Sequence, residues 1–264
     1  MANYYFLATL LPTLRIGATP EIGSRELAFF LRQNLQEDDL EKVAALRRLV
    51  DIENIQSIWR KEPIRDEGNF NELELEESLL FQEGLPSYVI DFMNEYKETA
   101  QRLKAFPQLL HRFFETEMSL EAGFLADYFR FEWEWRIAFV ALRARELGRD
   151  MVTEMEYEDP ENPFVAELLA QSGSNTFALP EPYFELQKIF ELNKHSPLGL
   201  YQTLLEWRFN KIETYIEWES YSITRILGYI AQLDIVEEWL KLDKRKGIEV
   251  VNRIIEQSQV GERR

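Results

Sequence analysis

The stretch FEWEWRIAFVALRARELGRD, residues 131–150, decides the fold because it carries two conflicting patterns. Its first residues alternate between charged and aromatic, as the residues of a half-buried strand do. A longer pattern overrides this one, because six apolar residues are separated by four, three, four, three and four positions: Phe124, Tyr128, Phe131, Trp135, Ala138 and Leu142. That spacing places all six on one face of an α-helix. The stretch therefore predicts a long helix.

The remaining residues of this stretch lie outside the apolar stripe or at its edge. Glu132 and Arg136 are four positions apart in the order that favours an ion pair, which contributes ~0.3–0.5 kcal/mol when both are exposed. A tryptophan off the stripe, such as Trp133, either packs on a second layer of helices or marks an interface with another protein. We expect Trp133 to pack inside the molecule.

Helical spacing of apolar residues continues through most of the chain, and no series of strands joined by hairpin turns is found. Asp38 or Asp39 is placed to cap the second helix, and Asn71 to start an acidic helix whose leucines we expect to face the core. Loops are indicated at 61–70, 150–163 and 171–182, with a short helix between the last two. The other predicted helical segments are 25–35, 40–59, 71–82, 87–106, 107–118, 119–147, 182–193, 197–216, 223–243 and a last basic-ended segment.

These patterns predict an all-α protein, an elongated multi-helix bundle of two or three lobes with a short extended N-terminal segment. A chain of 264 residues is long for a single core. Leu147-Gly148 has the form of a helix end and precedes an acidic, proline-containing loop. We therefore expect an N-terminal helical lobe at 1–150 and a C-terminal helical lobe at 151–264, with one continuous helical unit as the alternative.

The composition excludes several kinds of site. The chain has no cysteine, so it has no disulfide, zinc ribbon, iron–sulfur cluster or thiol nucleophile. Its first fourteen residues carry no charge, lack the Lys or Arg start of a signal peptide and are too short to span a bilayer. We expect a soluble, unprocessed protein in the cytoplasm.

The net charge of −17 is concentrated in two acidic segments. Residues 66–98 hold ten Asp or Glu against Lys97, and residues 150–191 hold ten against Lys188. Such a field repels phosphate backbones, so we expect no nucleic-acid partner. The acidic segments serve solubility or dock a basic partner, and the first reading is the commoner one for charge runs.

No motif predicts catalysis or cofactor binding. The two histidines, His111 and His195, form i,i+4 pairs with Glu115 and Glu191, which is too few ligands for a dinuclear metal site, so we read both as structural or surface residues. The chain has no phosphate-binding GxxxxGK[ST] loop, no GxGxxG turn and no GxSxG elbow. We therefore expect no enzyme activity, no catalytic or metal-binding residues and no cofactor.

Short motifs along nearly the whole chain carry a family resemblance. They are Tyr4-Tyr5-Phe6-Leu7, Leu11-Pro12, Asp51, Asn54, Gly68-Asn69-Phe70, Phe131, Glu132, Trp135, Arg136, Ala141, Arg143, Leu147-Gly148-Arg149-Asp150, Leu233-Asp234-Ile235 and Trp239. In order and kind they are similar to a bacterial family of uncharacterised helical proteins encoded among V-type ATPase (V-type ATP synthase) genes. That family looks like a shortened counterpart of the central-stalk socket protein of these complexes, known as the C or d component, which is itself longer and built from repeated helical lobes.

The resemblance implies a non-catalytic, all-helical accessory or central-stalk subunit that couples the rotor shaft of the ATPase to its membrane ring. Its partners would be those two parts of the complex, and its place would be peripheral, at the inner face of the membrane. The acidic segments would then face basic partner surfaces. Two alternatives stay open: a helical adaptor unrelated to ATPases that binds a partner peptide through an aromatic groove, and an enzyme with a deep polar pocket of perturbed acids.

Overall fold

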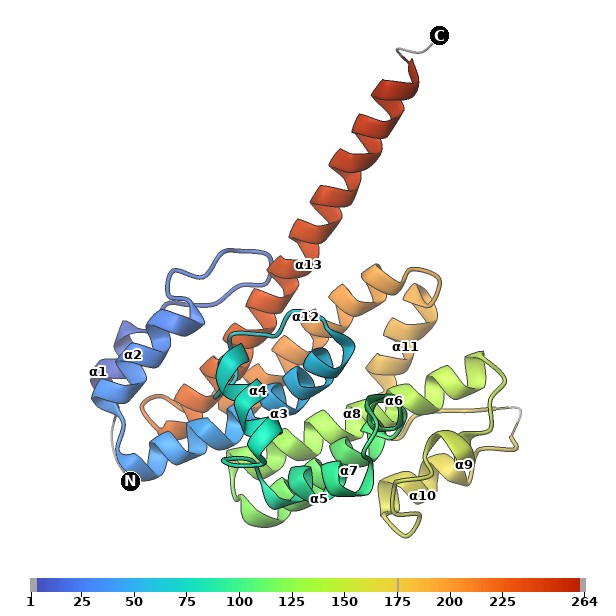
Figure 1. Cartoon of the computed structure of the whole chain (residues 1–264), viewed down its shortest axis with the longest axis horizontal. Helices are drawn as coiled ribbons and strands as arrows, with labels where there is room; N and C mark the ends of the chain where they lie inside the picture. The colour runs from blue at the N-terminus through green and yellow to red at the C-terminus, as the bar shows by residue number, and fades with distance from the viewer. Residues whose placement is uncertain (1–3, 175, 262–264) are drawn as a thin grey trace. The chain divides into compact units, whose positions relative to one another are not determined.

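The computed structural model describes residues 4–174 and 176–261, with side chains described as far as residue 242, and every regular element in these ranges is a helix (Figure 1). The all-α prediction is confirmed. The chain divides into two compact units, of which unit 1 comprises Met1–Asn34 and Asn193–Arg264, and unit 2 comprises Leu35–Leu192. The acidic segments at 66–98 and 150–191 both belong to unit 2.

Unit 1 is built from both ends of the chain. Its helices are α1 (Tyr5–Leu10), α2 (Ser24–Asn34), α12 (Pro197–Ile216) and α13 (Ile223–Gly261). Helices α12 and α13 pack against each other as a helical hairpin, and α2 packs on α13 (Figure 1). The Tyr4 amide donates to the Tyr221 carbonyl at 2.9 Å, and both the amide and the hydroxyl of Ser24 donate to the Glu237 carboxylate at 2.9 Å. These bonds hold the segment from Tyr4 to Ser24 against the last helices of unit 1.

Unit 2 surrounds the long helix that the sequence predicted. Its helices are α3 (Glu37–Arg60), α4 (Glu72–Phe81), α5 (Ser87–Glu95), α6 (Thr99–Lys104), α7 (Phe106–Leu120), α8 (Phe124–Glu146), α9 (Met151–Glu154), α10 (Pro163–Leu169) and α11 (Phe184–Asn193, whose last residue is assigned to unit 1). All six residues of the predicted apolar stripe on α8 are buried. Helix α8 ends before Leu147-Gly148, as expected, with Gly148 at a φ of +62°.

Several expected details of the helices are wrong. The N-terminal segment is not extended at residues 5–10, because the buried Leu7 and the Tyr4–Tyr221 bond hold these residues as helix α1. The expected helix at 87–106 breaks after α5, and Glu98 begins α6 with a capping box. Neither Asp38 nor Asp39 caps α3, since Gln36 occupies the N-cap position, and Asp39 pairs with Lys42 at 2.7 Å instead.

The two units follow a different division from the predicted lobes, because residue 150 falls inside unit 2. The physical reason is that α8 has a second contact surface. Trp133 and Glu134, off the main stripe, hydrogen-bond to Glu158 and Tyr183. These bonds attach the chain beyond residue 150 to α8. The helices predicted separately at 223–243 and beyond form one continuous helix, α13.

Unit 1 yields a test of its packing at Gly228. A Cβ atom there would lie 2.5 Å from Ile216 Cγ2 and 2.7 Å from Ile216 Cδ1, and Ile216 is fully buried. We expect Gly228→Val to lower the free energy of unfolding by at least ~2 kcal/mol through overpacking. Urea denaturation measures the loss, and Gly173→Val is the matched control because no atom lies within 4 Å of a Cβ at Gly173. Equal midpoints for the two variants would contradict this packing.

Candidate functional site

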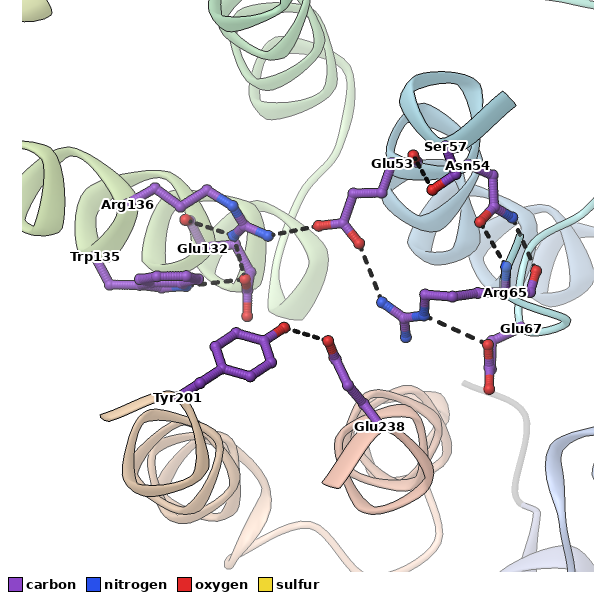
Figure 2. Close-up of polar contacts among 10 residues, drawn as sticks. All are labelled: Glu53, Asn54, Ser57, Arg65, Glu67, Glu132, Trp135, Arg136, Tyr201 and Glu238. Atoms are coloured by element: carbon purple, nitrogen blue, oxygen red, sulfur yellow. Dashed lines mark hydrogen bonds and ion pairs between the residues drawn. The ribbon is translucent and has the colours of Figure 1, made fainter. Parts of the chain in front are cut away.

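The residues that carry the chemistry of unit 2 form a polar cluster between α3, the loop that follows it and α8 (Figure 2). Most of the internal motifs named from sequence meet here, although they lie far apart in the chain. Asp51 and Asn54 come from α3, Gly68-Asn69-Phe70 from the loop, and Glu132, Trp135 and Arg136 from α8.

Asp51 fixes the end of the loop to α3. Its Oδ1 atom accepts hydrogen bonds from the amides of Asn69 at 2.7 Å and Phe70 at 3.4 Å, and its Oδ2 atom accepts one from the Asn69 side chain at 2.7 Å. A Cβ atom at Gly68 would overlap Asp51 Oδ1, so only glycine permits this approach. Asp51 and Gly68-Asn69-Phe70, which are separate motifs in the sequence, are therefore in direct contact.

Asn54 fixes the start of the same loop. Its side chain is fully buried, accepts a hydrogen bond from the Arg65 amide at 2.8 Å and donates one to the Arg65 carbonyl at 2.9 Å. An amide side chain thus satisfies both backbone groups of one residue. Since a buried backbone group without a partner costs about 1–3 kcal/mol, this pairing specifies where the loop leaves α3.

Glu53 joins the loop to α8 through two arginines. Its Oε2 atom lies 3.0 Å from Arg65 Nη1, and its Oε1 atom lies 2.9 Å from Arg136 Nη2 (Figure 2). Arg65 also reaches the buried Glu67 at 3.4 Å. The carboxylate of Glu53 is a third exposed, whereas Arg136 is mostly buried. This chain of ion pairs connects three segments that the sequence separates by up to 83 residues.

Glu132 is the deepest charge of the cluster, with no exposed surface. It accepts a hydrogen bond from Trp135 Nε1 at 2.9 Å and forms a short ion pair with Arg136. The Arg136 guanidinium lies 4.6 Å from the Trp135 ring centre and 5.6 Å from that of Phe114. The ion pair that the i,i+4 spacing predicted is therefore buried, where the loss of one partner leaves an uncompensated charge.

Trp133 and Glu134 face the segment beyond residue 150. Trp133 is buried, as expected, and its Nε1 atom donates to Glu158 Oε2 at 2.9 Å. The same oxygen lies 3.1 Å from His111 Nδ1, and this contact raises the pKa of His111. Glu134 accepts a hydrogen bond from the Tyr183 hydroxyl at 2.8 Å, and burial raises its pKa. These contacts give His111 a structural role.

A hollow of about 430 Å³ lies beside the cluster, and some of the side chains that line it have raised pKa values. Arg48, Asp51 and Tyr88 contribute to its lining. Burial raises the pKa of Asp51 to about 6 despite its three donors, and it raises the pKa of Tyr88. Tyr88 donates to the buried Glu117 at 3.2 Å, and Arg48 lies 3.2 Å from the same carboxylate. The titratable groups Arg48, Asp51, Tyr88 and Glu117 therefore all have partners inside the protein.

The histidines and acidic residues that could act as metal ligands are arranged as follows. Within the described ranges, no group of three or more His, Cys, Asp or Glu side chains is placed to hold a metal ion. His111 Nε2 lies 3.9 Å from Glu115, and Glu191 and His195 are both exposed. Sequence reasoning named Asp51, Asn54 and Glu132 but missed Glu53, Arg65 and Tyr88, which no motif or periodicity distinguishes from ordinary surface or core residues.

No helix within the described part of the chain is both long enough and apolar enough to span a bilayer.

The first prediction from the cluster concerns Arg136. We expect Arg136→Met to lower the free energy of unfolding by ~3 kcal/mol or more, because Glu132 is left buried without its cation. Adding Glu132→Gln should restore at least ~1 kcal/mol by removing the buried charge. Urea denaturation measures both effects. Arg130→Met is the matched control, because Arg130 pairs with Asp127 on the same helix with both side chains more than half exposed. A loss no larger than that of the control would refute the buried pair.

The second prediction concerns the pH dependence of stability at Asp51. Its folded-state pKa of about 6 lies above the unfolded value of about 3.9, so the folded protein binds more protons between these values. The contribution of Asp51 to stability therefore falls as pH rises from about 4 to about 6, by ~2 kcal/mol. Unfolding free energies of the wild type and Asp51→Asn, measured across this range, should diverge by that amount. Parallel profiles would contradict the raised pKa.

Comparison with known proteins places the chain in a family. The family model described as "Protein of unknown function (DUF2764)" matches residues 1–261. Curated relatives described as uncharacterized proteins occur in Chlamydia pneumoniae, with 29% identity over 96% of this chain and 98% of the relative, and in Chlamydia muridarum, with 28% identity over 96% and 97%. A relative from Chlamydia trachomatis serovar D is 28% identical over 96% and 97%. No solved structure matches the chain. Because the family model covers almost the full length, the chain belongs to the DUF2764 family.

Proposed function

We propose that the protein is a non-catalytic accessory or central-stalk subunit of a V-type ATPase, similar to the socket protein of the central stalk, which couples the rotor shaft to the membrane ring. The proposal starts from the sequence resemblance and places the protein in the cytoplasm, peripheral to the inner face of the membrane. Its partners are the shaft and ring proteins, and it needs no cofactor.

The observation that supports the proposal is the set of contacts that the residues of the resemblance make within unit 2. Asp51, Asn54 and Arg136 each bind another segment of the same unit, and the buried Glu132 pairs with Arg136 on its own helix. A subunit that transmits torque needs a stiff body, and a helical body cross-linked by buried polar bonds resists the sliding of one helix past another. The resemblance and the packing thus point to the same mechanical role.

A helical adaptor unrelated to ATPases is the second candidate, and exposed aromatic residues in unit 1 favour it. Trp218 is 88% exposed, and the half-exposed rings of Tyr5 and Tyr221 lie 4.9 Å apart. Aromatic side chains are enriched at protein interfaces, so this part of unit 1 suits a partner peptide. The gene neighbourhood separates the two candidates, because genes for ATPase head and ring proteins beside this gene favour the stalk role.

A pull-down from native membranes tests the proposal directly. The full-length protein, tagged and expressed in its own host, is captured from gently solubilised membranes, and the bound proteins are identified by mass spectrometry. We expect ATPase head subunits to be recovered. A tagged helical protein of similar net charge is the control for capture by charge alone. Reproducible recovery of other proteins without any part of the ATPase would contradict the proposal and favour the adaptor.

The acidic segments add an expectation for purified components. Binding to isolated shaft or ring proteins should weaken as salt rises from about 50 to about 500 mM, because screening reduces attraction between the acidic segments and basic partner surfaces. Binding that does not change with salt would show that the acidic segments do not contribute to the interface.

A further inference from the structure

Helix α4 (Glu72–Phe81) has apolar residues on both of its faces. The inner face is buried through Leu75 and Leu79, whereas Leu73 is 65% exposed, Leu80 is 75% exposed and Phe81 is 66% exposed. The sequence prediction that the leucines of this helix face the core is therefore wrong for Leu73 and Leu80. Two leucines seven positions apart lie ~10 Å apart on the same side of a helix. The outer face of α4 thus presents a regular apolar stripe to solvent.

Carboxylates border this stripe. Glu77 lies between Leu73 and Leu80 on the outward side of the helix, and it lines a hollow of about 460 Å³ together with Glu74, Glu83 and Phe81. All three glutamates are exposed. The α4 face, defined here as Leu73, Glu77, Leu80 and Phe81 with the hollow beside them, therefore combines apolar contact area with concentrated negative charge.

A second hollow adjoins the first and extends the apolar surface. Asn69 and Phe70 line both hollows, and Ile55, Leu85 and Val89 contribute apolar side chains to the second one. The position of Phe70 is fixed from below, because Asp51 holds the backbone of Asn69 and Phe70. A binding partner would thus meet a preformed surface rather than a loop that must first be ordered.

We propose that the α4 face is the docking site for a basic amphipathic helix of a partner protein. Apolar residues of that helix pack on Leu73, Leu80 and Phe81, as the knobs of a coiled coil do. Its lysines or arginines lay their aliphatic stems against Phe70 and Phe81 and place their cations beside the glutamates of the hollow. We take the partner to be a helix because Leu73 and Leu80 lie along one side of α4, and the apolar face of an amphipathic helix packs on such a strip.

The negative charge of the α4 face argues against the other possible occupants of this site. A membrane of anionic lipids or an acidic helix would bring like charges together, and a symmetric pairing of two α4 faces would oppose their glutamates. A small apolar ligand would leave the carboxylates without counterions. The inference needs only the α4 face and not the ATPase assignment, so a pull-down and a peptide-binding measurement can fail independently.

The test uses the full-length protein and a synthetic helical peptide of roughly three heptads with leucines at the a and d positions and lysines at e and g. A second peptide has glutamates in place of the lysines. Fluorescence anisotropy measures the Kd. We expect the lysine peptide to bind at least ~10-fold more tightly than the glutamate peptide, and its Kd to rise at least ~10-fold between about 50 and about 500 mM salt.

Variants locate the site. Leu73→Ser with Leu80→Ser should raise the Kd of the lysine peptide at least ~10-fold, and Glu77→Lys with Glu83→Lys should do the same. All four side chains are exposed, so their replacement leaves the core intact. Leu120→Ser with Leu192→Ser is the matched apolar control, because these leucines of unit 2 are 71% and 85% exposed. Glu167→Lys with Glu185→Lys is the matched charge control, because it replaces two exposed acids of the same unit.

Three results would overturn the proposal. The first is equal loss of binding in the control variants, which would show non-specific attraction. The second is equal binding of the two peptides. The third is self-association of the wild type in analytical ultracentrifugation that the double leucine variant abolishes, because the occupant would then be a second copy of the chain.

Discussion

Unit 2 depends on the position of one guanidinium group. Glu132 has no exposed surface, and a carboxylate buried to that extent destabilises a protein unless a cation and hydrogen-bond donors accompany it. Arg136 supplies the cation and Trp135 supplies a donor. Arg136 also binds Glu53, and Glu53 binds Arg65. The cation that neutralises the buried charge on α8 therefore also links α8 to α3 and, through Glu53, to the loop after α3.

The same constraint explains the strand-like start of the sequence FEWEWR. Its polar and aromatic residues serve two sides of one helix, because α8 is covered on more than one face. Glu132 and Trp135 belong to the polar cluster, whereas Trp133 and Glu134 bind Glu158 and Tyr183. Charged and aromatic residues alternate because a buried polar group needs a partner close by, and an indole N–H is one such donor. Periodicity identified the helix, but it did not indicate that a second layer buries the ion pair.

The sequence was informative where the physical cause is local. Asn71 caps α4 through a capping box with Glu74, and Leu147-Gly148 ends α8, since both signals lie within one helical turn. The division into units was not predictable in this way, because the bonds between Ser24 and Glu237 join residues 213 positions apart. The cluster was predicted in part. Motifs named Asp51 and Asn54, but the roles of Glu53 and Arg65 follow only from three-dimensional proximity.

The residues behind the ATPase resemblance and the surface that suits a partner are different parts of unit 2. Asp51, Asn54 and Arg136 are occupied by internal bonds, so a similarity at these positions is a similarity of scaffold. Leu73, Leu80 and Phe81 contribute little to that scaffold because they are more than half exposed. A scaffold can be shared by proteins with different partners, since function depends on the site and not on the fold. On our proposal, the exposed α4 face rather than the buried cluster selects the partner that unit 2 binds.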